Sequence, residues 1–185
     1  MTAPAELDRE TILRALARLS ELLGERGATG EVCLLGGTVM VLAFNARAST
    51  KDVDAIFQPA QMIRELARIV QRELDLPENW INDGAKGFVS PRHEASEGDL
   101  PQFEHLRLLA PPPAYLLAMK CMASRIAADP EHGGDVRDIA FLVRHLGLTA
   151  PEQAMAIVAG YYPEARIPAR ARFLLEEVFT LLGGV

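Results

Sequence analysis

Hydrophobic residues recur along the first part of the chain with both helical and extended spacings. Apolar residues separated by four, three and four positions predict a helix over residues 8–26. Short apolar runs predict two buried strands, at 31–35 and 52–57, and further apolar segments predict helices at 38–45 and 60–73. The chain therefore begins as an alternation of helices and short strands.

The second part of the chain is mostly helical in its pattern. Residues 75–102 are irregular and contain several Gly and Pro residues, with a short strand end at 80–83, and strand-like alternation returns at 104–109. Four more helices are predicted, over residues 113–128, 134–146, 151–160 and 169–182. This order predicts an α+β fold with an α/β-type core, in one domain that combines a sheet-containing core (1–110) with a helical C-terminal half (111–185).

Composition and charge narrow the function classes. Of the 185 residues, 49% are hydrophobic and 24% are charged, as in ordinary globular domains. The 19 Lys and Arg against 25 Asp and Glu give a net charge of −6, which disfavours a protein that coats nucleic acid. No apolar run approaches a membrane span, and the first residues do not resemble a signal peptide. We therefore expect a cytoplasmic protein with no membrane partner, whose two cysteines, Cys33 and Cys121, are reduced and buried.

A Gly-Gly-Thr sequence stands between the first predicted strand and the helix after it. Glycine lets the backbone approach an anion closely, and the N–H groups at a helix N-terminus point toward such a ligand. Thr38 is expected to cap this helix and to offer its hydroxyl to a phosphate, beside Gly36 and Gly37. The alternative is an ordinary strand–glycine–helix turn that binds nothing.

Two carboxylates, Asp52 and Asp54, lie on the otherwise apolar second strand. Residues i and i+2 of a strand share a face and lie roughly 7 Å apart. Two like charges so placed repel each other and lose hydration unless a cation lies between them. Their oxygens suit Mg²⁺, which takes one or two carboxylates together with substrate phosphates and water. The alternative is a pair of exposed acids at a strand end.

Together, the Gly-Gly-Thr turn and the Asp-x-Asp strand resemble the nucleotidyltransferase superfamily, which includes DNA polymerase beta and the minimal bacterial nucleotidyltransferases. Residues 113–146 look like the helical half of the AbiEii-type toxins and their bacterial relatives, through Lys120, Arg125 and the sequence Asp135-Val-Arg-Asp138. Trp80-Ile-Asn-Asp83 resembles a further motif of that branch. The resemblance covers roughly residues 30–150 and implies a small mixed β-sheet of the nucleotidyltransferase type.

The resemblance also implies an activity. The enzyme would be Mg²⁺-dependent, with Mn²⁺ as an alternative metal, and would transfer NMP from an NTP to a hydroxyl of an RNA such as tRNA, of a protein or of a small molecule. Gly36, Gly37 and Thr38 would bind the triphosphate. Asp52 and Asp54 would bind one ion on the β- and γ-phosphates, or two ions, the second activating the attacking hydroxyl. The AbiEii-type branch further implies a toxin–antitoxin setting, with a cognate antitoxin as partner.

The same resemblance makes Lys120 a phosphate-binding lysine and a catalytic residue beside the two aspartates. Because its helix neighbours are apolar, the alternative is a lysine that snorkels to the helix surface. Asp138 lies on the inward side of its predicted helix and is expected to orient Lys120 or Arg125. Asp135 either joins this group or is a charge favoured at a helix N-terminus.

One part of the family pattern is missing. Many active members carry a third carboxylate on a neighbouring strand, which helps to deprotonate the acceptor. Only Asp83 and Glu104 are candidates for it here. The alternative function is therefore a catalytically degenerate module that binds a nucleotide or a partner protein without turnover.

Two groups of arginines stand apart from these motifs. Arg64, Arg68 and Arg72 recur every four residues on one predicted helix, and a second group lies within 166–172. Each group is either a solvated, ion-paired surface or a contact for an RNA backbone. The histidines show no metal-ligand spacing and are assigned no role.

Overall fold

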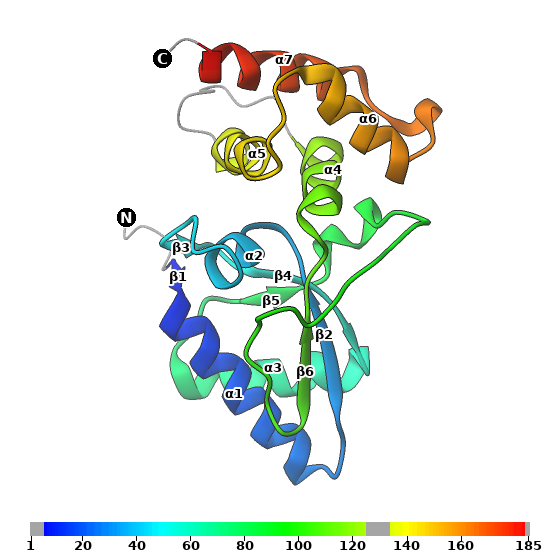
Figure 1. Ribbon diagram of the computed structural model, residues 1–185. Coiled ribbons are helices and arrows are strands. Elements are labelled where there is room, and N and C mark those ends of the chain that lie inside the picture. The colour runs from blue at the N-terminus through cyan, green and yellow to red at the C-terminus, as the bar shows by residue number, and fades with distance from the viewer. Residues whose placement is uncertain (1–5, 125–133, 184–185) are drawn as a thin grey trace. The chain divides into compact units, whose positions relative to one another are not determined.

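The computed structural model describes residues 6–124 and 134–183 (Figure 1). Over these residues the protein is a mixed α+β structure that divides into two compact units. The first unit comprises residues 1–86 and 95–110, and the second comprises residues 87–94 and 111–185. The predicted α+β class is confirmed.

In its described residues, the first unit contains three α-helices and two small sheets. Its strands are β1 (Leu7–Asp8), β2 (Gly30–Leu34), β3 (Ser49–Thr50), β4 (Val53–Gln58), β5 (Ile81–Asn82) and β6 (Leu106–Leu109), and its helices are α1 (Arg9–Glu25), α2 (Gly36–Leu42) and α3 (Ala60–Leu74). Four strands form a mixed sheet in the order β5-β4-β2-β6. In this sheet β2 runs antiparallel to β4 and parallel to β6, while β4 and β5 are parallel. β1 and β3 pair separately, antiparallel to each other.

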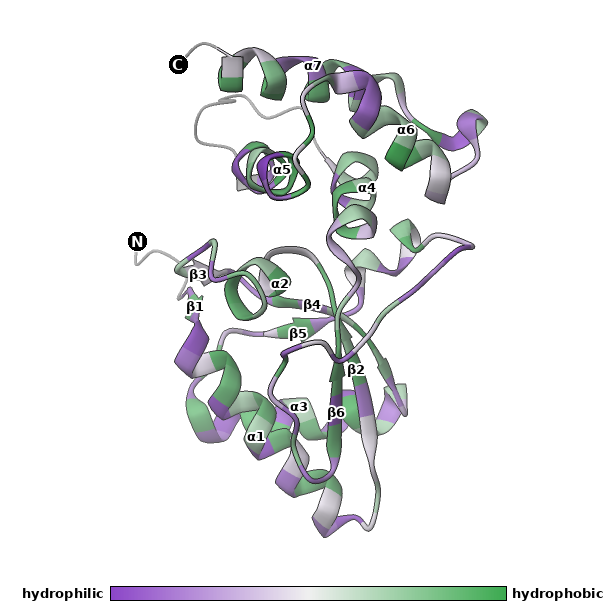
Figure 2. Cartoon of the chain, viewed as in Figure 1, coloured by the Kyte–Doolittle hydropathy of each residue, from purple (hydrophilic) through white to green (hydrophobic). Residues whose placement is uncertain are grey.

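The core of the first unit lies between one face of the sheet and the pair of helices α1 and α3, which also pack against each other (Figure 1). Both helices have a hydrophobic and a hydrophilic side (Figure 2). A Cβ at Gly30, the first residue of β2, would contact Leu23 of α1 and Ile63 of α3. Val32 and its partner Phe57 lie on the same face and are buried.

The opposite face of β4 carries the aspartates. Val53 and Ala55 are fully buried, whereas Asp54 is half-buried, as is Asp52 immediately before the strand. This alternation is the one that the sequence predicts, and it turns both carboxylates away from α1 and α3.

The second unit is helical. It contains α4 (Pro113–Ala123), α5 (Gly134–His145), α6 (Pro151–Tyr161) and α7 (Ala169–Gly183). The segment 87–94, expected to be an irregular loop, belongs to this unit because it is bonded to its helices. The Ser90 N–H donates to the Tyr115 hydroxyl at 2.8 Å, and Arg92 donates to the Gly160 carbonyl at 2.7 Å.

Several element boundaries differ from the prediction. The helix predicted to start at Thr38 begins two residues earlier, at Gly36, and ends at Leu42. The helix predicted over 113–128 ends at Ala123, and residues 125–128 of that prediction lie outside the described residues. β1 and β3 were not predicted, because a two-residue strand is too short to show a period.

Across the described residues, no helix combines the length and the apolar character needed to cross a membrane.

Both cysteines are buried free thiols. Burial raises the pKa of Cys33 to about 11 and the pKa of Cys121 to about 12, so both stay protonated at neutral pH.

Candidate functional site

The glycine turn lies directly against the segment that carries the aspartates. The Leu35 N–H donates to the Asp54 carbonyl at 2.8 Å, which extends the β2–β4 pairing up to the glycines. A Cβ at Gly36 would lie 2.7 Å from Asp54 Oδ2, and the φ of Gly36 is +55°. The Asp54 carboxylate therefore lies on the backbone of Gly36, where both the close approach and the left-handed φ require glycine.

Gly37 is enclosed by the loop that leads to Asp52. A Cβ at Gly37 would lie 2.7 Å from Thr50 Oγ1 and 2.9 Å from Arg47 Nη1. The half-buried Arg47 thus places a positive charge beside the glycine turn. Sequence reasoning missed Arg47 and Thr50, because no local pattern indicates that this loop folds back onto Gly37.

Thr38 does not cap α2, so that prediction is wrong. The N-cap residue is Leu35, and Thr38 lies inside the helix with its side chain fully buried. The Thr38 hydroxyl donates to the backbone carbonyl of Asp52 at 3.2 Å, and the Thr50 hydroxyl donates to the same oxygen at 3.2 Å. Thr38 therefore fixes the backbone of Asp52 against α2.

Asn82 holds the side chain of Asp52. In the parallel pairing of β4 with β5, Asn82 lies opposite Asp54. Asn82 Nδ2 donates to Asp52 Oδ2 at 2.9 Å, and the Gly84 N–H donates to Asn82 Oδ1 at 2.9 Å. Asn82 belongs to the Trp-Ile-Asn-Asp motif, but the motif alone indicated no role for its amide.

Trp80 anchors the short strand β5. Its side chain is 1% exposed, and its indole Nε1 donates to the Ala67 carbonyl of α3 at 3.0 Å. The Val53 N–H donates to the Trp80 carbonyl at 2.6 Å, which joins β5 to the start of β4. Trp80 therefore determines where Asn82, two residues later, is placed.

The two candidates for a third carboxylate are directed elsewhere. Asp83 accepts a hydrogen bond from Arg64 of α3 at 2.6 Å, on the helix-covered side of the sheet. The Glu104 side chain is 87% exposed and lies 3.8 Å from His105, just before β6. Within residues 6–124 and 134–183, no group of three or more His, Cys, Asp and Glu side chains is arranged to hold a metal ion. Asp83 and Glu104 thus have neighbours other than Asp52 and Asp54.

Lys120 lies in the helical unit as part of a buried ion pair. Its Nζ is 2.6 Å from Asp138 Oδ2, and the two side chains are 7% and 1% exposed. The alternative of a snorkelling lysine is therefore wrong, and the predicted contact with Asp138 is present. Asp135 lies 3.6 Å from Lys120 and is 51% exposed. It also lies in the first turn of α5, so it both belongs to the group around Lys120 and places a negative charge at a helix N-terminus. Arg125 lies outside the described residues.

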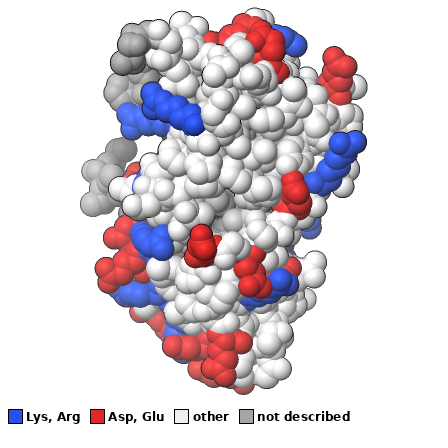
Figure 3. Space-filling model, viewed as in Figure 1, with Lys and Arg blue, Asp and Glu red and all other residues white. Residues whose placement is uncertain are grey.

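One arginine of each group, Arg64 and Arg170, has a structural partner in the described parts of the chain. Arg64 pairs with Asp83 and lies over the ring of Phe57, 5.5 Å from its centroid. Arg170 donates to the Ser124 carbonyl at 2.8 Å, just after α4. On the face seen in Figure 3, acidic and basic side chains are mixed rather than gathered in one basic area. These observations favour the ion-paired interpretation for Arg64.

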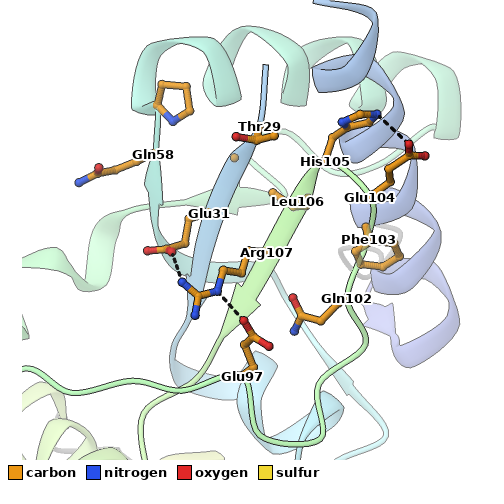
Figure 4. Close-up of a pocket in the computed structure, with 12 residues that line it drawn as sticks. Thr29, Glu31, Gln58, Glu97, Gln102, Phe103, Glu104, His105, Leu106 and Arg107 are labelled. Carbon is orange, nitrogen blue, oxygen red and sulfur yellow. Dashed lines mark hydrogen bonds and ion pairs between the residues drawn. The ribbon is translucent and has the colours of Figure 1, made fainter. Parts of the chain in front are cut away.

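A groove of about 700 Å³ lies at the other end of β2 and β4, beside Gln58 and Glu104 (Figure 4). Arg107 lies between Glu31 and Glu97 and pairs with both, so its positive charge offsets part of the acidic charge of the groove. This groove contains none of the glycines or aspartates of the candidate site.

No protein-family model, no curated protein and no solved structure matches this chain. The resemblance to nucleotidyltransferases therefore depends on the motif residues and on the contacts between them.

We expect replacement of Gly36 by alanine to destabilise the first unit by more than the roughly 1–2 kcal/mol that a left-handed backbone costs a residue with a Cβ. The excess arises because the new Cβ would displace the Asp54 carboxylate. Gly27→Ala is the matched control, since Gly27 has a φ of +62° but a Cβ there would meet no atom of the described residues within 4 Å. Urea unfolding measures both losses, and an equal loss in the two variants would contradict the close approach of Asp54.

Proposed function

We propose that this protein is a Mg²⁺-dependent nucleotidyltransferase, which moves NMP from an NTP to a hydroxyl acceptor. The observation that carries the proposal is the contact of the Gly36–Gly37 turn with the Asp52–Asp54 segment. These two motifs are separated along the chain, and each one alone is common. Their contact places a pair of hard oxygen ligands directly against a glycine turn. The small mixed sheet of the first unit would then be a nucleotidyltransferase core.

The two aspartates fit a divalent cation. Both are half-buried, and both are held in place, Asp52 by Asn82 and Asp54 by its contact with Gly36. Carboxylate oxygens are the ligands that Mg²⁺ and Mn²⁺ prefer. Asp52 and Asp54 would hold the ion, which when bound neutralises charge on the phosphates of the NTP.

The remaining residues of the site would bind and orient the nucleotide. A phosphate would approach the part of the half-buried Gly36–Gly37 backbone that Asp54, Thr50 and Arg47 do not cover. Arg47, beside Gly37, carries a planar guanidinium whose donors match phosphate oxygens. Because the Thr38 hydroxyl already donates to Asp52, we assign Thr38 to holding the aspartate rather than to the triphosphate.

Two parts of the proposal depend on the family resemblance. One is phosphate binding by Lys120, whose ammonium group is held by Asp138. The other is a role as a toxin neutralised by a cognate antitoxin, with RNA, protein or a small molecule as acceptor. Both stay predictions about the chain.

The direct test is isothermal titration calorimetry of the full chain with ATP, GTP, CTP and UTP in the presence of Mg²⁺. We expect at least one NTP to bind, and the double variant Asp52→Ala/Asp54→Ala to lose that binding. Asp83→Ala is the matched control, because it removes a nearby carboxylate that pairs with Arg64 instead. Equal binding by the double variant and the wild-type protein would contradict the proposal.

A catalytically degenerate binding module is the second candidate function. The placement of Asp83 and Glu104 favours it, because neither is directed toward Asp52 and Asp54. Labelled NTP incubated with tRNA and with cell lysate separates the candidates. Transfer of label and release of pyrophosphate support the enzyme, whereas NTP binding without either supports the module.

A further inference from the structure

The edge strand β6 has the segment 96–103 of the same unit along its outer side (Figure 4). We propose that the carboxamide of Gln102, in this segment, takes the place of a backbone peptide group at the edge. In doing so it prevents β6 from pairing with β6 of a second copy of this chain. The inference does not depend on the proposed function, because segment 96–103 contains no residue of the candidate site.

The backbone groups of β6 point alternately toward β2 and away from it. The His105 carbonyl accepts a hydrogen bond from the Gly30 N–H at 2.8 Å, so every second residue after His105 faces β2 as well. The N–H and C=O groups of Leu106, Leu108 and Ala110 therefore point to the outer edge. A row of such groups at a sheet edge, when it is left open, is a template for pairing with another chain.

Backbone groups of segment 96–103 cover both ends of this row. Leu106 and Phe103 exchange two hydrogen bonds, of 3.3 and 3.2 Å, and Ala110 and Ser96 exchange two more, of 2.9 and 3.0 Å. Both pairs are antiparallel. The segment therefore runs beside β6 like a further strand at these two places.

At the middle of the row, a regular strand would fail to supply a donor. Hydrogen-bonded pairs of antiparallel strands recur at every second residue, so the register of Phe103 with Leu106 would set Pro101 opposite Leu108. Proline has no N–H. Pro101 could therefore not donate to the Leu108 carbonyl.

The side chain of Gln102 supplies both a donor and an acceptor at this place. Its Nε2 donates to the Leu108 carbonyl at 3.0 Å, and the Leu108 N–H donates to its Oε1 at 2.9 Å. Because a backbone N–H only donates and a C=O only accepts, these two bonds fix the orientation of the amide. A carboxamide has the same donor and acceptor as a peptide group, so Gln102 completes the covered row.

Leu108 is also the residue about which two copies of β6 would pair. A two-fold antiparallel pairing centred on Leu108 would set Leu106 of each copy against Ala110 of the other, with hydrogen bonds at all three outward residues. Arg107, the charged residue of β6, would have a leucine directly opposite, so that no like charge would oppose the contact there. Gln102 occupies the centre of this pairing.

The test follows two quantities in the full chain, namely self-association by analytical ultracentrifugation and hydrogen exchange of the Leu108 amide by NMR. For Gln102→Ala we expect faster exchange of Leu108 in dilute solution and roughly tenfold stronger self-association than for the wild-type protein. The Leu108 amide of this variant should become protected again as the protein concentration rises. That recovery would locate the contact between copies at the edge.

Two further variants control this comparison. Gln58→Ala removes the same amide from an exposed residue of the same groove, on β4 rather than at the edge, and should change neither quantity. Gln102→Glu keeps an acceptor for the Leu108 N–H and adds a negative charge, and charges on an edge strand oppose pairing. We therefore expect Gln102→Glu to keep the Leu108 amide protected and to associate no more than the wild-type protein.

The contradicting outcomes are distinct. Faster exchange of Leu108 in Gln102→Ala without stronger self-association would overturn the protective role, and unchanged exchange would overturn the assignment of the amide to the edge. Equal self-association of Gln102→Glu and Gln102→Ala would show that the contact is not edge pairing. Loss of the fold in Gln102→Ala would also refute the proposal, because the amide would then support the fold itself. None of these results depends on Mg²⁺ or NTP, so the proposed function is decided separately.

Discussion

Replacement of Asp138 by alanine is expected to destabilise the helical unit by about 3–5 kcal/mol. Asp138 Oδ2 lies 2.6 Å from Lys120 Nζ, and the two side chains are 1% and 7% exposed. The variant would leave the ammonium group buried without its closest counter-charge. Water cannot replace the lost carboxylate at so little exposure, which is why the loss should exceed that of a surface ion pair.

Two variants serve as controls for this prediction, and urea unfolding followed by circular dichroism measures all three. Asp135→Ala removes the other carboxylate near Lys120, at 3.6 Å, but its side chain is 51% exposed. We expect it to cost about 0–1 kcal/mol, as exposed ion pairs do. The pair Lys120→Met/Asp138→Leu should recover most of the stability, because no buried charge remains. Equal losses in Asp138→Ala and Asp135→Ala would contradict the assignment of Asp138 as the main partner.

Replacement of Trp80 by alanine is expected to destabilise the first unit by about 3–5 kcal/mol. The indole is 1% exposed, so alanine would leave a cavity between α3 and β5. The hydrogen bond from Trp80 Nε1 to the Ala67 carbonyl would also be lost. Because Trp80 is the one tryptophan of the chain, circular dichroism rather than fluorescence follows the unfolding.

Trp80→Phe retains most of the packing and removes the hydrogen bond. It keeps a large apolar ring but loses the bond to Ala67 and the part of the indole that a phenyl ring does not fill, so we expect a smaller loss of roughly 1–3 kcal/mol. If Trp80→Ala is as stable as Trp80→Phe, the ring does not carry the packing energy that its burial indicates.

The parts of the fold with a strong period were predictable from the sequence. The four-three-four spacing of apolar residues placed α1 within one residue of its observed ends, Arg9 and Glu25. The segment 87–94 shows the opposite case. Its membership in the helical unit depends on contacts such as Ser90 with Tyr115, 25 residues apart, and such contacts leave no local pattern.

The candidate site was likewise predictable only where a local sequence pattern places its residues. The shared face of Asp52 and Asp54 follows from strand alternation, and the two glycines follow from the turn. The prediction for Thr38 was wrong because α2 begins two residues earlier, which moves its hydroxyl into the interior. Asn82 and Arg47 reach the site only through the pairing of β5 with β4 and the folding of a loop, neither of which a single sequence encodes locally.

The division of the chain also determines how this protein can be dissected. The chain passes between the units at residues 86/87, 94/95 and 110/111, so neither unit is one continuous stretch. A fragment that starts at Pro111 would lack Ser90 and Arg92, which bond to Tyr115 and Gly160 of the helical unit. Expression of the helical unit on its own would therefore require residues 87–94 to be fused to it through a new connection, for example by circular permutation.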